Sequence, residues 1–284
     1  MRESFPIVRR PASGARAPIV VSVPHYGTEA LPQVTREDYC EPRFETFAYG
    51  FADTFACDLY GDLHRHGATV LATPVSRMFV DVNRRRDDFE QRDGAVCSKR
   101  GVVRTHTMRD VAIFAHPLTP AELEARLRAL YDPYYATLER LLAEARAAHG
   151  YAILLDAHTG SPRRMGDHEV ILGTCRASTC GPELTRTVAA IFSRHGFRVA
   201  DNVSGYTGGN IVATYGRPQA GVHALQLEIN ASLLMTTSRE ELIALITRGG
   251  VPDRAEATIT RLRECLRETL AALPAAVTAE KDVS

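Results

Sequence analysis

One stretch decides how this chain folds, and it reads Ala152-Ile153-Leu154-Leu155-Asp156-Ala157-His158. Its apolar first half, without a polar interruption, is typical of a strand that is covered on both faces of a sheet. Comparable runs, the first broken only by Ser22, lie at 18–23, 69–73, 170–172 and 224–227. Segments with helical spacing separate these runs. We therefore predict an α/β fold, a single three-layer domain over residues 1–284 with a mixed, largely parallel sheet.

Two shorter apolar runs, at 79–82 and 210–214, are also predicted to be strands. The spacing of apolar residues predicts helices over 44–66, 123–145, 182–195 and 259–270. Gly67 should end the first of these helices. Pro133 divides the second, so that a new helix can begin there with Asp132 as its cap.

Two segments depart from this alternation of strands and helices. Residues 84–109 are charged, contain glycine and are long for a plain loop, so we expect a hairpin insertion or a functional flap. The polar residues 278–284 are expected to form a disordered tail.

The composition excludes several classes of protein. With 34 basic and 34 acidic residues the formal net charge is zero, which excludes binding of nucleic acid or an anionic membrane through overall charge. No apolar run approaches the ~20 residues that span a bilayer. The N-terminus lacks the apolar stretch of a secretory signal. We therefore expect a cytoplasmic protein, whose six scattered cysteines are reduced thiols.

Ligands of such sheets collect beyond the carboxyl ends of the strands. His25 follows the first predicted strand, and Asp156 and His158 follow the strand at 152–155. Two imidazoles are suitable ligands for a catalytic zinc or another divalent transition metal. Asp156 could orient the ring of His158. The alternative for each residue is a structural hydrogen bond or a strand cap.

A catalytic zinc usually takes a third protein ligand. Glu29 lies four residues after His25, and Asp53 lies in the first predicted helix. Both carboxylates are chemically suitable, and either could instead be a solvated or capping acid.

Arg84 and Asn83 are candidates for binding a substrate. A guanidinium group binds a carboxylate through two hydrogen bonds, and Asn83 adds an amide donor beside it. Alternatively, the arginines at 84–86 form a solvated cluster that is paired with Asp87 and Asp88.

Glu228 is an acid among apolar neighbours, and a buried carboxylate is costly unless it is paired or used. Near a metal-bound water, such a glutamate can accept a proton and pass it to a leaving amine. Gly208 and Gly209 form a turn that permits close approach of the backbone to a ligand, or they form a tight turn and nothing more.

Short motifs follow one another in order from about residue 20 to 235. They are SVPHYGT at 22–28, SR at 76–77, DVNR at 81–84, DAHT at 156–159, VILG at 170–173, GG at 208–209 and QLEI at 226–229. In this order they resemble the N-formylglutamate amidohydrolase family. The resemblance implies a fold similar to zinc carboxypeptidases and aspartoacylase-like deacylases.

The resemblance also implies a zinc site. His25, His158 and an early carboxylate would hold the ion. Zinc carboxypeptidases carry Glu three residues after the first His, where this chain has Thr28. Asp53 resembles the Asp at the start of the first helix in formylglutamate hydrolases, so it is favoured over Glu29.

The reaction implied by the resemblance is hydrolysis of N-formyl-L-glutamate to formate and L-glutamate, at the end of a histidine-degradation route. Glu228 would act as the general base, and Arg84 with Asn83 would hold a carboxylate of this small acidic substrate. One alternative is a deacylase or carboxypeptidase-like hydrolase of another N-acyl amino acid or a small peptide. A second is a non-catalytic binding protein on the same fold.

Overall fold

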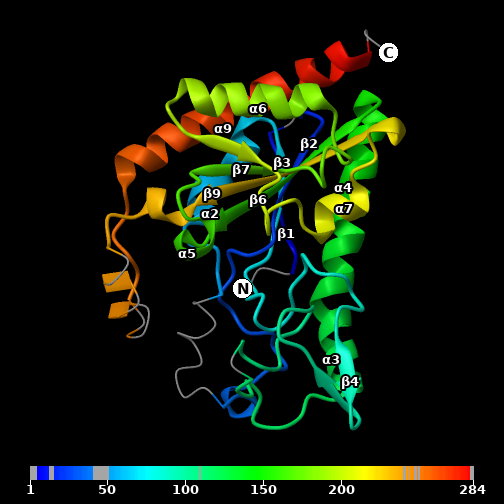
Figure 1. The fold of residues 1–284 in the computed structure, drawn as a ribbon. Coiled ribbons are helices and arrows are strands. Elements are labelled where there is room, and N and C mark those ends of the chain that lie inside the picture. The colour runs from blue at the N-terminus through cyan, green and yellow to red at the C-terminus, as the bar shows by residue number, and fades with distance from the viewer. Residues whose placement is uncertain are drawn as a thin grey trace.

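The fold is that of a computed structural model, which describes residues 5–12, 16–40, 51–108, 110–238, 241–242, 244–245, 248 and 250–281. Its centre is a seven-stranded sheet in the order β1-β3-β2-β6-β9-β7-β8 (Figure 1). The strands are β1 (Ile7–Arg9), β2 (Ile19–Val23), β3 (Thr69–Ala72), β6 (Ala152–Gly160), β7 (Val170–Gly173), β8 (Val199–Asp201) and β9 (Val222–Asn230).

The sheet is mixed and largely parallel. β1 runs antiparallel to β3, and β7 runs antiparallel to β9, while the remaining pairs are parallel. Every residue of β2, β3, β6, β7 and β9 is buried, as expected of strands that are covered on both faces. The predicted α/β class is confirmed.

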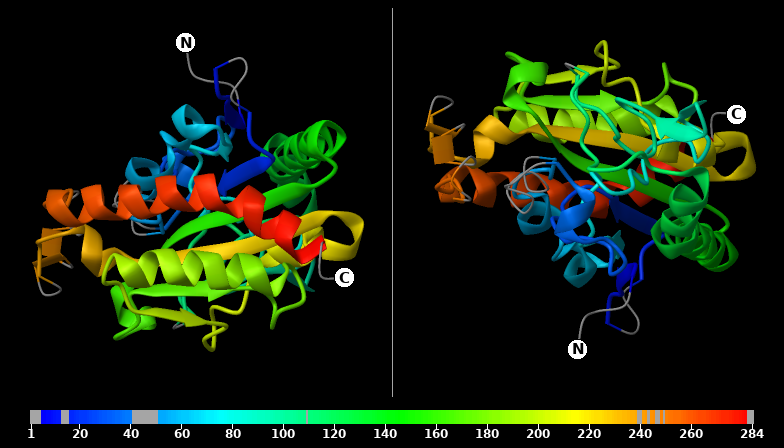
Figure 2. Two further views of the ribbon diagram at one scale, coloured as in Figure 1. Left: turned by 90° about the horizontal axis from the view of Figure 1, so that it is seen from above. Right: turned by 90° about the horizontal axis from the view of Figure 1, so that it is seen from below.

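Helices cover both faces of the sheet. On one face, α2 (Ala56–Tyr60), α6 (Pro182–Arg194) and α9 (Glu256–Lys281) enclose an apolar core. Figure 2 shows α6 and α9 side by side across this face. On the other face, the core contains α3 (Pro120–Arg126), α4 (Asp132–His149) and α7 (Asn210–Tyr215). Each helix of the described residues is too short or too polar to cross a bilayer.

The short helical segments are η1 (Arg36–Asp38), η2 (Leu63–His66), η3 (Leu127–Tyr131), α5 (Pro162–Met165), η4 (Pro218–Ala220) and η5 (Ala231–Leu234). Segment 84–109 contains an antiparallel hairpin of β4 (Glu90–Arg92) and β5 (Ala95–Cys97), one of the two forms expected for it.

Two predicted strands are wrong. Residues 79–82 are irregular, with turns at 79 and 82, and the apolar side chains of this run are buried on the α3–α4 side without entering the sheet. Residues 210–214 lie in the helix α7, which begins directly after Gly209 and buries Ile211 and Val212. In both cases a short apolar run signals burial and not the type of element.

The helix predicted over 44–66 is much shorter. Residues 41–50 lie outside the described residues, and residues 51–55 are not helical. Phe55 has a left-handed backbone with φ 57°, so α2 begins only at residue 56. Gly67 ends the following segment η2 with φ 92°, as predicted.

The cap predicted at Asp132 is also wrong. The helix continues through a wider π-turn, η3, into α4, whose first residue is Asp132, and the Asp132 carboxylate accepts hydrogen bonds from Arg86 instead. The predicted disordered tail is wrong up to residue 281, because α9 extends through Lys281. Residues 282–284 lie outside the described residues.

Candidate functional site

A pocket of about 690 Å³ opens where β2, β6 and β9 end. Its wall contains most of the side chains that the sequence singled out: His25, Asp53, Asn83, Arg84, His158, Gly208, Gly209 and Glu228. Because β2 and β6 are adjacent and parallel, residues 133 positions apart in the chain meet here. The geometry of the sheet is therefore what creates the site.

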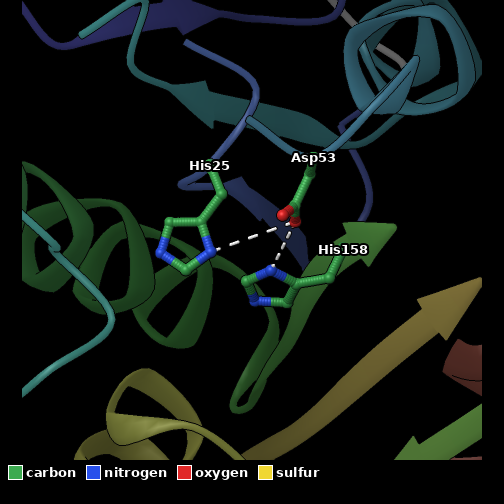
Figure 3. Close-up of side chains that lie close together, drawn as sticks. All are labelled: His25, Asp53 and His158. Atoms are coloured by element: carbon green, nitrogen blue, oxygen red, sulfur yellow. Dashed lines mark hydrogen bonds and ion pairs between the residues drawn. The ribbon is translucent and has the colours of Figure 1, made fainter. Parts of the chain in front are cut away.

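His25, Asp53 and His158 point toward one another (Figure 3). The Oδ2 atom of Asp53 lies 2.9 Å from Nδ1 of His158 and 3.9 Å from Nδ1 of His25. One potential ligand atom from each residue lies within 4.8 Å of the others. Both imidazoles are buried, and the Asp53 side chain is 10% exposed. Two imidazole nitrogens and a carboxylate oxygen form a donor set suited to zinc.

Local structure fixes each member of this group. Asp53 lies in the irregular turn before α2, where its N–H donates to the carbonyl of His25 (2.8 Å). His158 lies inside β6, which continues through Gly160. The expectation that the strand ends at residue 155 is therefore wrong, because Asp156 and His158 both lie within β6 and do not follow it.

Carboxylates also hold the far sides of both rings. Asp81 Oδ1 lies 2.7 Å from His25 Nε2, and Asp156 Oδ2 lies 3.1 Å from His158 Nε2. Such partners fix the orientation of ligating rings and raise their basicity. The sequence suggested this role for Asp156, and Asp81 is an addition from the structure.

The two histidines differ in electrostatics. Burial lowers the pKa of His25, and the neighbouring Arg77, whose Nη1 is 2.7 Å from His25 Nδ1, lowers it further. Burial also acts to lower the pKa of His158, but nearby carboxylates, Asp156 foremost, raise it well above its usual value. The surrounding carboxylates therefore favour the positively charged form of His158, whereas the surroundings of His25 favour its neutral form.

Glu228 is buried in β9, beside the histidines. Its pKa is raised to about 7, mainly by burial; His158 opposes this rise, and Asp53 contributes to it. Gln226 Nε2 donates to Glu228 Oε1 (2.7 Å), and the other end of this amide, Gln226 Oε1, is buried without a hydrogen-bond partner in the described part of the chain. A carboxyl group with a pKa near neutrality can both accept and release a proton.

Both polar atoms of the Asn83 side chain are engaged in contacts within the protein. Its Nδ2 donates to Asp156 Oδ2 (2.8 Å) and lies 3.0 Å from His158 Nε2, and its Oδ1 accepts from the backbone N–H of Ile211 (2.9 Å). A Cβ at Gly209 would lie 2.5 Å from the Asn83 side chain, so glycine is required for this contact. Asn83 thus links the ligand shell to α7.

Glu29 stands apart from the His25–Asp53–His158 group. It is exposed, and its backbone pairs with Pro74 and Ser76 at the edge of the sheet. The structure therefore brings Asp53, and not Glu29, to the two histidines.

Sequence reasoning missed Arg77 as a site residue, as well as Arg104, Arg164 and Tyr206, all of which line the pocket. They come from irregular segments and a short helix, where no periodic pattern marks which side chains point inward. One indication of a role for Arg77 and Asp81 is present in the sequence, namely their position: Asp81 lies in the DVNR motif with Asn83, and Arg77 lies four residues before Asp81.

Comparisons with known proteins agree on one family. A sequence model described as N-formylglutamate amidohydrolase matches residues 17–235. An N-formylglutamate deformylase of Pseudomonas aeruginosa is 32% identical over 267 residues, which cover 90% of this chain and 94% of that protein. An enzyme of the same name from Pseudomonas putida is 31% identical over 242 residues, covering 80% and 87%.

Solved structures share the fold. The crystal structure of N-formylglutamate amidohydrolase from Ralstonia eutropha has a TM-score of 0.78 at 24% identity, covering 98% of this chain and 99% of that one. A gene product of Agrobacterium tumefaciens has a TM-score of 0.68 at 17% identity, covering 97% of both chains.

Proposed function

Because this chain belongs to the N-formylglutamate amidohydrolase family, we propose that it hydrolyses N-formyl-L-glutamate to formate and L-glutamate. The observation that carries the proposal is the group of His25, Asp53 and His158 with the Glu228 carboxyl group in the same pocket. A role in histidine degradation and a cytoplasmic location are further predictions of this assignment.

The residues present fit a divalent transition metal, and zinc is our choice. Two Nδ1 atoms and one carboxylate would hold the ion, and Asp81 and Asp156 already orient the rings. When bound, zinc supplies a Lewis acid that lowers the pKa of water to about 7 and polarises the formyl carbonyl.

Glu228 is the proposed general base. It accepts a proton from the attacking water and later delivers one to the nitrogen of the departing glutamate, so that the amide C–N bond breaks and one water is consumed. Its pKa of about 7 suits both transfers near neutral pH. Arg77, on the same wall, is a charged donor for the oxygen of the tetrahedral intermediate.

Arg84 is the proposed carboxylate anchor. Its side chain lines the pocket directly after Asn83, and it makes no ion pair with any described residue. Asn83 was expected to donate beside it, but both ends of its amide are engaged, so we assign to Asn83 the positioning of Asp156 and His158. Gly208 and Gly209 complete this wall of the pocket.

Substrate screening tests the assignment. Purified protein loaded with zinc is offered N-formyl, N-acetyl and N-succinyl amino acids, and release of the acid is measured. We expect N-formyl-L-glutamate to give the highest kcat/KM. Equal rates across the set would favour a different deacylase. A protein that binds less than about 0.2 equivalents of metal and gains no activity with zinc would favour the non-catalytic alternative.

A further inference from the structure

The pocket contains guanidinium groups that form no ion pair with any described carboxylate. Arg84, Arg104 and Arg164 all line it, and none of them makes an ion pair with a described residue. By contrast, Arg77 lies 3.7 Å from Asp53, and Arg86 outside the pocket binds Asp132. Asp81 and Asp88 line the same pocket, but neither forms an ion pair with these three arginines.

Arg104 is the most informative member. Its Nε atom is buried and has no hydrogen-bond partner among the residues that the structure describes, and its Cζ lies 5.0 Å from the centre of the Phe51 ring. The pKa of Arg104 is lowered to about 10, mainly by burial and then by the neighbouring Arg77; Asp81 opposes this shift, and Arg84 and Arg164 add smaller lowering effects. A partly buried cation among like charges is costly unless an anion accompanies it.

The backbone holds Arg104 firmly in this position. Val103 before it is fully buried, and Thr105 after it is 4% exposed. The N–H of Thr105 donates to the carbonyl of Ser98 (2.9 Å), and its carbonyl accepts from Ile113 (2.8 Å). The guanidinium therefore projects into the pocket from a fixed segment, which reduces the entropy lost when a ligand binds.

Arg164 lies at the rim of the same pocket. It comes from α5, directly after β6, and its Cζ is 5.8 Å from the centre of the Tyr206 ring. Its side chain is exposed, so it can reach a group held by Arg104 without paying for burial. Arg164 would therefore supply a second hydrogen-bond donor to a bound carboxylate, with a smaller contribution than Arg104 because it is more exposed to solvent.

The geometry points to a second carboxylate subsite, in which Arg104, aided by Arg164, binds one carboxylate of the substrate while Arg84 binds the other. This inference rests on the proposed function, because N-formylglutamate carries two carboxylates that are separated by three carbon atoms. Arg84 follows Asn83, which touches His158, so we assign the α-carboxylate to Arg84 and the side-chain carboxylate to Arg104. Selection for a dicarboxylate thus depends on segment 84–109.

Binding of two simple acids tests the subsite without any turnover. Glutarate has the two carboxylates of glutamate at the same separation, and valerate has one carboxylate on a chain of equal length. Calorimetry on the zinc-loaded wild-type protein should give at least ten-fold tighter binding of glutarate. Arg104→Met should remove this preference, Arg164→Met should reduce it about three-fold, and Arg104→Lys should restore part of it.

Arg100→Met is the matched control, because Arg100 lies in the same segment, is exposed and does not line the pocket. It should keep the full preference for glutarate. Equal binding of both acids by the wild type, or an Arg104→Met variant that still prefers glutarate, would overturn the subsite.

Turnover distinguishes this inference from the proposed function. We expect Arg104→Met to lower kcat/KM for N-formyl-L-glutamate about 100-fold, mainly through KM, and to change that for N-formyl-L-glutamine less than three-fold. A wild type that prefers glutarate but does not hydrolyse N-formyl-L-glutamate would overturn only the reaction. A structural role of Arg104 against Phe51 alone would lower the melting temperature and leave both preferences intact.

Discussion

Glu228 lies directly opposite His158 in the parallel register of β9 and β6. Opposed residues of neighbouring strands point to the same side of the sheet, so the carboxyl group and the imidazole share one face of the pocket. Both strands are buried along their whole length, which fixes this pair against movement. The proposed base and a proposed metal ligand are therefore held in place by backbone hydrogen bonds and not by a loop.

Substituting the proposed base, Glu228, should lower the rate of hydrolysis without lowering the amount of bound metal. We expect Glu228→Gln to lower kcat for N-formyl-L-glutamate by about 10³-fold, in the range found for general bases, because the amide cannot accept a proton. The bound metal, measured by elemental analysis, should stay at the wild-type level. Full activity in this variant would exclude Glu228 as the base.

The activity should depend on the pH through Glu228. A general base acts when it is deprotonated, so kcat/KM should rise with pH through the pKa of about 7 that burial gives this group. Gln226 donates to the Glu228 carboxylate and favours its charged form. Gln226→Met should therefore shift the acidic limb upward by about one pH unit, measured as a full pH profile of kcat/KM. An unchanged limb would indicate that another group is titrating.

The third metal ligand can be decided by comparing two carboxylates. Asp53→Ala should weaken zinc binding about 100-fold or more, since even partners of ligands contribute 10- to 100-fold. Glu29→Ala should bind zinc as the wild type does, because Glu29 is exposed and away from both histidines. Competition with a chelator measures both. The opposite ranking would restore Glu29 as the ligand.

Two stacked tyrosines position the segment that carries Arg84. Tyr131 donates to the carbonyl of Arg84 (2.8 Å), Tyr135 donates to that of Val82 (2.9 Å), and their rings lie 4.4 Å apart. Tyr135→Phe removes the hydrogen bond to Val82 and also the one that this hydroxyl accepts from Asn210 Nδ2 (2.7 Å). It should raise KM for N-formyl-L-glutamate about five-fold, which corresponds to ~1 kcal/mol, with kcat nearly unchanged.

Tyr215→Phe is the control for this substitution, because the Tyr215 hydroxyl lies 3.5 Å from the carbonyl of Tyr135 and contacts neither carbonyl of the segment. A similar rise of KM in both variants would mean that general packing of the aromatic cluster, and not the hydrogen bond to Val82, is responsible.

Five strands of the sheet, β2, β3, β6, β7 and β9, could be predicted from the sequence because they are buried on both faces and therefore appear as apolar runs. The strands β1 and β8 lack such a run, since they are only partly buried, and they were not predicted. The same signal failed at 79–82 and 210–214, where apolar residues are buried in turns and in a helix. The helix before Gly67 was predicted too long because a left-handed residue, Phe55, interrupts the amphipathic pattern. Backbone reversals of this kind have no periodic signature.

The site was predictable where chemistry and strand position coincide. His25, His158 and Glu228 lie at or within strands, so topology alone brings them to one edge. Asp81 and Arg104 were missed as site residues because they lie in irregular segments, whose path depends on tertiary contacts such as the hydrogen bond between Asp81 N–H and the carbonyl of Val102.

The hairpin segment 84–109 has one more consequence. His158 and Glu228 lie within strands of the sheet and His25 lies just beyond β2, whereas Arg104 enters the pocket from segment 84–109. With Arg104 as the proposed side-chain anchor, substrate selection depends on a different segment of the chain from cleavage, so one could be exchanged without rebuilding the other. Replacing segment 84–109 with that of a relative that prefers a different substrate side chain is a direct route to deacylases of new specificity on the same fold.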